Sequence, residues 1–119
     1  MHEMSLAGGI LKIVEDAAAR DGFARVSRLV LEAGALAGVE VSALRFALEA
    51  LSPGTLLEAA IIEIEQPAGR AWCMLCSQNV SIGSRTDPCP CCGGWQLTPT
   101  GGTELRVREL IVHDVGLKE

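Results

Sequence analysis

Apolar positions along this chain recur with two different periods. Between residues 5 and 20 they return every three or four positions, which is the spacing of one helix face: Leu6, Ile10, Ile13, Val14 and Ala17. Residues 41–51 repeat that spacing with Val41, Leu44, Leu48 and Leu51. Asp21-Gly22 and Ser52-Pro53-Gly54 supply the stop signals after each stretch. We predict a helix in each.

Three other stretches read as strands. Residues 24–33 and 56–65 alternate between better and less well buried positions, as strands with one buried face do. A third stretch covers 104–114. The expected fold class is therefore α+β, with two helices on one face of a three-stranded, mainly antiparallel sheet.

The segment between the last two strands differs in composition. Residues 69–100 are rich in Gly, Ser, Thr and Pro and contain all five cysteines. We predict that they form an inserted zinc-ribbon-like module of two short hairpins. The predicted domains are thus 1–68 together with 101–119, and 69–100.

Composition narrows the class of protein. The 119-residue chain has a net charge of -5, two Trp, two Phe and no Tyr, so its core must be aliphatic. No apolar run approaches the ~20 residues of a membrane span. The acidic balance argues against nucleic-acid binding, which needs clustered Lys and Arg.

The cysteines carry the strongest chemical signal. Cys73 and Cys76 form one C-x-x-C pair, and Cys89 and Cys92 form another after twelve residues. Two such pairs at short separation favour a tetrahedral zinc site with four thiolate ligands. A redox C-x-x-C pair and an iron–sulfur cluster fit this cysteine spacing less well. A disulfide framework would need an oxidising compartment, and the N-terminal sequence shows no export signal. Cys91 is either a spare thiol or an alternative ligand.

The N-terminus offers a second group of ligands. With Met1 retained, the Met1 α-amine, the His2 amide nitrogen and the His2 imidazole can approach one metal ion, and the Glu3 amide is a further candidate. Nitrogen ligation of this kind suits square-planar Ni(II) or Cu(II). Most isolated histidines at chain termini have no such role, and His113 near the other end shows nothing further.

Several segments together resemble the HypA/HybF family of hydrogenase nickel-incorporation proteins. They are the opening MHEMSL, LEAGALAGV at 31–39, LRFALEAL at 44–51, GTLLE at 54–58, the double C-x-x-C and GTELRV at 102–107. The resemblance covers nearly the whole chain. Two departures are the extra thiol of Cys91 and Ser77, where glycine is common in the family.

The resemblance implies a cytoplasmic nickel metallochaperone. It assigns nickel to His2 and Glu3, with the Met1 amine as a candidate, and structural zinc to Cys73, Cys76, Cys89 and Cys92. It implies two partners, a nickel-handling maturation GTPase and the immature large subunit of [NiFe]-hydrogenase, and in some members a role in urease maturation. It implies neither a membrane nor a nucleic-acid partner. We expect a monomer or a weak homodimer.

We therefore expect a carrier protein and not an enzyme. No Ser/His/Asp or Cys/His arrangement and no phosphate-binding glycine loop stands out in the sequence. The alternatives are a zinc-ribbon module for protein or nucleic-acid interaction, and a thiol redox protein that uses Cys89, Cys91 and Cys92.

Overall fold

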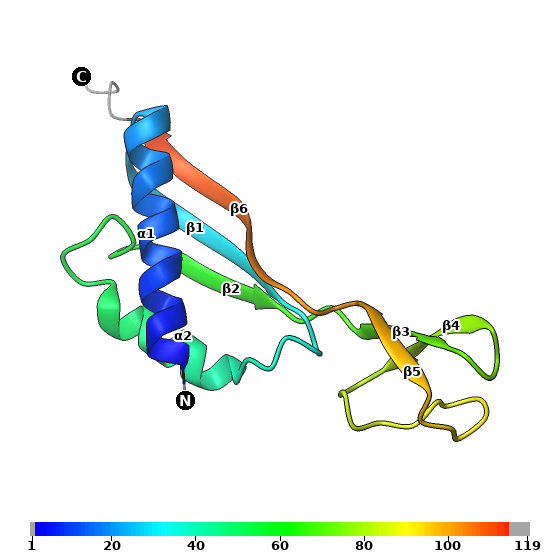
Figure 1. Ribbon diagram of the computed structural model, residues 1–119. Helices are drawn as coiled ribbons and strands as arrows, with labels where there is room; N and C mark the ends of the chain where they lie inside the picture. The colour runs from blue at the N-terminus through cyan, green and yellow to red at the C-terminus, as the bar shows by residue number, and fades with distance from the viewer. Residues whose placement is uncertain (1, 115–119) are drawn as a thin grey trace. The chain divides into compact units, whose positions relative to one another are not determined.

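The computed structural model describes residues 2–114, and these form two compact units (Figure 1). Unit 1 comprises residues 2–31, 40–64 and 107–114, and unit 2 comprises 32–39 and 65–106. No helix in the described part of the chain is both long and apolar enough to cross a membrane. The domain limits predicted from the sequence stay a prediction.

Helix α1 spans Glu3–Asp21 and is longer than predicted. It runs unbroken through Gly8-Gly9 and ends at Gly22, whose left-handed conformation (φ 79°) lets its N–H bond to the Ala18 carbonyl. Its buried face includes Ala7, Ile10 and Val14. Ile13 was expected on that face but is 55% exposed, because it lies one position beyond the narrow stripe that packs inward.

Helix α2 spans Val41–Leu51, as predicted. Its N-cap is Glu40, whose side chain accepts a hydrogen bond from the Ala43 N–H at 2.9 Å. At the other end, the Ser52 hydroxyl donates to the Leu48 carbonyl. Leu44 and Leu48 are buried, as their helical spacing predicts.

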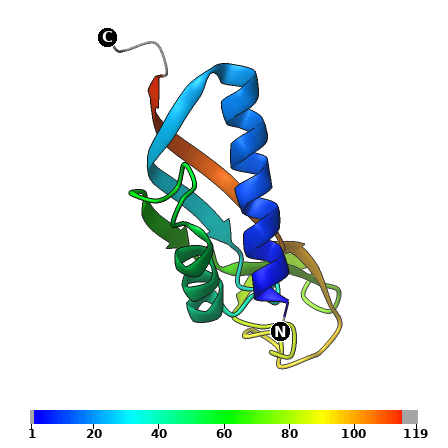
Figure 2. The same cartoon turned by 90° about the vertical axis from the view of Figure 1, so that its left-hand side faces the viewer.

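The first sheet has the order β2-β1-β6, from β1 (Phe23–Ala33), β2 (Ile61–Glu65) and β6 (Leu105–Asp114). Both helices lie on one face of this sheet (Figure 1 and Figure 2). The central strand, β1, carries the best-buried side chains: Leu29 and Leu31 are fully buried. The predicted α+β class, with two helices and a three-stranded sheet, is confirmed.

Strand β2 begins five residues later than predicted. Residues 52–60 form successive turns, in which the Thr55 hydroxyl donates to the Ser52 carbonyl and accepts from the Leu57 N–H. Leu57 is buried within this turn region. The mostly apolar residues 56–60 therefore belong to a packed loop, and the sequence pattern alone does not distinguish such a loop from a strand.

Unit 2 contains a second antiparallel sheet, of order β4-β3-β5. Its strands are β3 (Gly69–Cys73), β4 (Gln78–Ile82) and β5 (Leu97–Gly101). The β3–β4 pair is one of the two expected hairpins. The second hairpin does not form: β5 pairs with β3, and the second cysteine pair lies in the long loop before β5.

The small core of unit 2 includes a residue that precedes the cysteine segment by more than thirty positions. Leu36 packs with buried residues of the second sheet and loop: Ala71, Cys73, Val80, Ile82 and Cys89. Glycines allow the approach, since a Cβ on Gly34 would lie 2.1 Å from the Gly102 carbonyl oxygen. The Leu36 N–H donates to that same carbonyl at 2.7 Å.

The carboxylate of Glu3 joins the beginnings of the two helices. Glu3 is only 6% exposed, and its Oε2 accepts a hydrogen bond from the Glu40 N–H at 3.0 Å. The amino-terminal ammonium group, and then the Glu40 amide, lower the pKa of the Glu3 carboxyl from 4.5 to about 2. Glu3 is therefore charged at neutral pH and fastens α1 to the N-cap of α2.

We predict that Glu3→Gln lowers the stability of the nickel-free protein near neutral pH and that this loss shrinks in acid. A folded pKa of about 2 against an ordinary 4.5 means that the unfolded state binds the proton first. The stabilisation is then complete above 4.5 and disappears as pH falls toward 2. Urea unfolding midpoints over this range measure it.

Glu15→Gln, which removes an exposed carboxylate from the same helix, is the control. A stability difference between Glu3→Gln and wild type that stays constant from pH 7 to pH 2 would contradict the role given to the Glu3 charge.

Candidate functional site: a four-cysteine metal centre

Four cysteine sulfurs converge in unit 2. The Sγ atoms of Cys73, Cys76, Cys89 and Cys92 all lie within 4.8 Å of one another. Cys73 and Cys92 are separated by 3.7 Å, and Cys76 and Cys89 by 3.9 Å. Four sulfurs at ~2.3 Å from one tetrahedral ion would lie about 3.8 Å apart. The cluster therefore has the dimensions of a single-ion tetrathiolate site.

The second sheet and its loops hold these sulfurs in place. Cys73 ends β3, and a tight turn follows in which the Cys76 N–H points at the Cys73 sulfur at 3.4 Å. In the second loop, the Cys91 N–H points at the Cys89 sulfur at 3.4 Å. Amide groups aimed at sulfur stabilise thiolates, as metal ligation requires.

Without a metal, two of the clustered cysteine thiols have widely different pKa values. The backbone N–H of Cys92, followed by that of Cys91, lowers the pKa of Cys89 to about 6. A hydrogen bond with the Cys92 side chain, and then burial, raises the pKa of Cys76 to about 12. A dication bound among the sulfurs would replace these protons and supply the missing positive charge.

Two positions of these loops restrict which residue fits, one through its backbone conformation and one through its neighbours. Ser77, directly after the first pair, has φ +54°, in the left-handed region that favours glycine, at a cost of roughly 1 kcal/mol. Its N–H donates to the Cys73 carbonyl. A Cβ on Gly94 would lie 2.8 Å from Leu75 Cδ1, so the exposed Leu75 side chain would have to shift to admit one.

The fifth cysteine lies outside the cluster. Cys91 is exposed, and the side-chain nitrogen of Gln78 lies 3.6 Å from its sulfur. Its backbone N–H faces the Cys89 sulfur, so the residue contributes to the loop through its main chain.

The N-terminal candidates lie in unit 1. His2 is the N-cap of α1; its side chain is exposed and makes no capping hydrogen bond. Met1 lies outside the described residues. The Glu3 carboxylate is buried against the backbone of Glu40, whereas the Glu3 amide, which is the nickel candidate expected from the sequence, follows His2 in the chain. The fold thus brings Glu40 to the start of α1, and nothing in the sequence pattern signals this.

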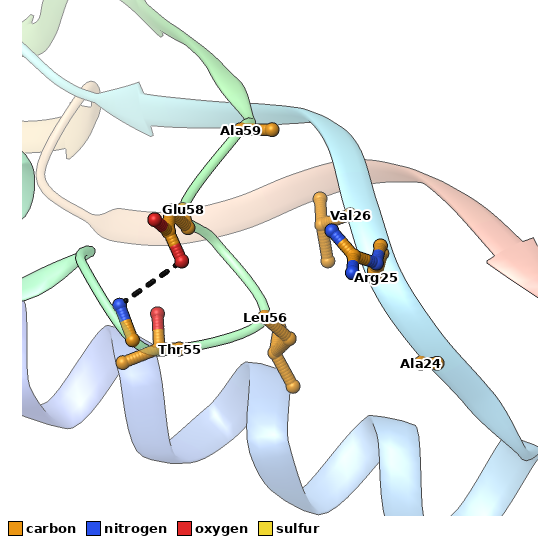
Figure 3. Close-up of a pocket in the computed structure, with 8 residues that line it drawn as sticks. Ala24, Arg25, Val26, Thr55, Leu56, Glu58 and Ala59 are labelled. Carbon is orange, nitrogen blue, oxygen red and sulfur yellow. Dashed lines mark hydrogen bonds between the residues drawn. The ribbon is translucent and has the colours of Figure 1, made fainter.

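A cavity elsewhere in unit 1 lacks comparable chemistry. It measures about 360 Å³ and lies between the start of β1 and the turns after α2 (Figure 3). Its charged residues are Arg25 and Glu58, and Glu58 already accepts a hydrogen bond from the Gly54 N–H at 3.2 Å. The lining contains no Cys, His or Ser, and the hydroxyl of Thr55, which also lines it, donates to the Ser52 carbonyl.

Comparisons with known proteins agree with this geometry. The family model described as "Hydrogenase/urease nickel incorporation, metallochaperone, hypA" matches residues 1–112. The hydrogenase maturation factor HypA of Polaromonas naphthalenivorans is 62% identical over 114 residues, covering 96% of this chain and 99% of that protein. The corresponding protein of Cupriavidus necator is 61% identical over 114 residues, covering 96% of each.

The fold also matches a solved structure. The solution structure of the Ni metallochaperone HypA from Helicobacter pylori aligns with a TM-score of 0.68 and 22% sequence identity, covering 96% of this chain and 99% of that one. At this identity the likeness concerns the fold alone. The family model and the two relatives decide the assignment: the chain belongs to the HypA family of nickel-incorporation metallochaperones.

Proposed function

We propose that this protein binds Ni(II) at its N-terminus and delivers it during [NiFe]-hydrogenase maturation, and in some settings urease maturation, while a four-cysteine zinc site stabilises unit 2. The observation that carries the nickel part is His2, which has an exposed imidazole without a capping bond at the start of a helix. Nickel is the cargo in this account, and zinc is a resident structural ion.

The nickel ligands follow from the helix start. The first amide groups of a helix lie outside its i→i−4 hydrogen-bond ladder, which supports the His2 and Glu3 nitrogens as candidate ligands beside the imidazole. Together with the Met1 amine they form a nitrogen-rich donor set, which suits square-planar Ni(II). Glu3 contributes its main chain to the metal and its carboxylate to the position of α1.

Zinc is the ion that the cysteine cluster suits best. Four thiolates at tetrahedral spacing leave no open coordination position, so the ion would be held for structure and would not react. An iron–sulfur cluster of several irons would spread the cysteine sulfurs further apart. All five cysteines are free thiols, which fits a protein of the reducing cytoplasm.

The metal module offers a surface for protein partners. Met74 and Leu75, in the first cysteine loop, are 63% and 60% exposed, and Trp95, after the second, is 67% exposed. They lie together, since the Met74 N–H bonds to the Gln96 carbonyl and Leu75 lies against Gly94. We propose that this apolar tip contacts the maturation GTPase or the hydrogenase large subunit.

The same surface does not favour the nucleic-acid alternative. No charged residue occurs in 71–83 or 88–103, and Arg70 and Arg85 are hydrogen-bonded to Ser81 and to the Leu36 carbonyl. A phosphate backbone would therefore meet no basic patch here. We propose that the protein is a carrier without enzymatic activity.

We predict that His2→Ala abolishes nickel binding and leaves about one zinc per chain, because imidazole ligation is lost while the cysteines are untouched. Metal content by native mass spectrometry, on protein with Met1 as its first residue and no tag, measures both ions. His113→Ala is the matched control and should keep both metals. Wild-type nickel stoichiometry in His2→Ala would refute the N-terminal site.

Cys89→Ser is expected to lose zinc and to unfold unit 2, whose small core includes Cys73 and Cys89 at 0% and 1% exposure. The helices of unit 1 should persist, since their core contains no cysteine. Cys91→Ser, which changes the exposed thiol, should behave as wild type. Zinc analysis with amide hydrogen exchange decides; retained zinc in Cys89→Ser would contradict the assignment.

If the apolar tip docks partners, the double variant Met74→Gln/Trp95→Gln should weaken binding to the GTPase or to the large subunit by about tenfold or more, because exposed apolar anchors dominate such contacts. Isothermal titration with each purified partner measures this. Ile61→Gln, at an apolar position of unit 1 that is 55% exposed, is the control. Unchanged affinity for both partners would eliminate the tip as the contact.

A further inference from the structure

The second sheet has one face in the core of unit 2 and the other in solvent. Along its central strand β3, Gly69, Ala71 and Cys73 are buried, whereas Arg70 and Trp72 are exposed. The neighbouring strands add short polar side chains to the exposed side: Asn79, Ser81, Thr98 and Thr100. We call these six exposed residues the outer face.

Trp72 lies at the centre of the outer face. It is opposite Asn79 of β4 and Thr98 of β5, and it is 41% exposed. Both neighbours are smaller than an indole ring, so the ring projects beyond them. Tryptophan and arginine surrounded by smaller polar side chains are typical anchors of protein interfaces.

The polar side chains of the outer face are held by one another. Arg70 Nη1 donates to the Ser81 hydroxyl at 3.1 Å. The Thr100 hydroxyl donates to Asn79 Oδ1 at 3.0 Å, and this bond passes over β3, because β4 and β5 lie on either side of that strand. Side chains that are already ordered lose less conformational entropy when a ligand binds.

The outer face offers hydrogen-bond donors and no negative charge. A guanidinium and an indole can only donate, and the Asn79 amide nitrogen keeps its donors because the Asn79 oxygen accepts from Thr100. Within residues 2–114 no protein atom accepts a hydrogen bond from the Trp72 indole. The six residues include no Asp or Glu. A complementary ligand therefore supplies acceptors and a negative charge.

The spacing and number of the charges select the class of ligand. Arg70 is the single cation of the outer face, which suits one carboxylate, whereas a nucleic-acid backbone needs several cations in a row. Arg70 and Trp72 are alternate residues of one strand and hence about 7 Å apart, which is also the spacing of alternate residues in an extended peptide.

We propose that the outer face binds an extended acidic segment of a partner protein. A carboxylate of that segment pairs with Arg70, and an apolar side chain two positions away packs on the Trp72 ring. Carbonyl groups of the segment accept from the Asn79 amide and the Trp72 indole. The outer face is formed by strands and is distinct from the apolar tip of the cysteine loops, and its ligand requires no nickel.

Two short capped peptides test the proposal by NMR titration of the zinc-loaded, full-length chain. One has a central glutamate with a leucine two positions away on each side and threonine between them, so that it fits in either direction; the other has lysine in place of the glutamate. At low ionic strength the glutamate peptide should shift the Trp72 indole signal and bind about tenfold more tightly than the lysine peptide.

Arg70→Glu should reverse this preference, because the lysine peptide then supplies the opposite charge. Trp72→Thr, which keeps a residue suited to a strand, should weaken both peptides by about tenfold. Arg25→Glu makes the same charge change at an exposed position of unit 1 and is the control, with the wild-type preference unchanged. Zinc content and circular dichroism verify that each variant is folded.

Three results would overturn the assignment of the outer face. They are a glutamate peptide that does not bind, a preference for it that survives Arg70→Glu, and single-stranded oligothymidylate that binds more tightly than the glutamate peptide. The last result would assign the outer face to nucleic acid.

Discussion

The convergence of four sulfurs within 4.8 Å is the constraint on which unit 2 depends. Its second sheet has strands of five residues each, and its buried core is six residues, two of which are the cysteines Cys73 and Cys89. So small a core cannot compensate for chain entropy by apolar burial alone. The energy of metal ligation is then folding energy, and the same thiolates that bind the ion also set the path of both loops.

The two metals in this account make opposite demands on the protein. A resident ion needs a closed, pre-shaped donor set, and unit 2 supplies it with N–H groups directed at sulfur. A transferred ion needs exposed ligands that can exchange, and the start of α1 supplies an uncapped His2. Glu3 allows an ordered helix start beside an exposed ligand. Its buried carboxylate fixes the start of α1, while the adjacent His2 imidazole stays in solvent.

The sequence predicted the parts of the fold that local patterns determine. Helix α2 was predicted at its observed limits, because its apolar spacing and its Ser-Pro-Gly stop are both local. The pairing of β5 with β3, the place of Leu36 in the module core and the contact of Glu3 with Glu40 depend on residues distant in the chain. No single-sequence pattern encodes those contacts. Part of 52–60 was predicted as a strand, but these residues form turns, and Leu57 is buried by the packing of those turns.

The candidate sites also differ in how far a local sequence pattern identifies them. Cysteine spacing indicated the four residues of the cluster, with Cys91 left as an alternative ligand, since C-x-x-C pairs are a local signature. His2 acquired meaning only through resemblance to a family, because a lone histidine carries no spacing information. Ser77 was noted as an unusual residue, and its left-handed backbone gives the physical reason why glycine suits that position.

The proposed function requires that one chain holds two metals in chemically different sites. X-ray absorption at the nickel and zinc edges of the doubly loaded, untagged protein distinguishes the two sites. We predict four sulfur scatterers at about 2.3 Å around zinc and a nickel shell of nitrogen without sulfur. Sulfur in the nickel shell, or nitrogen in place of sulfur around zinc, would contradict it.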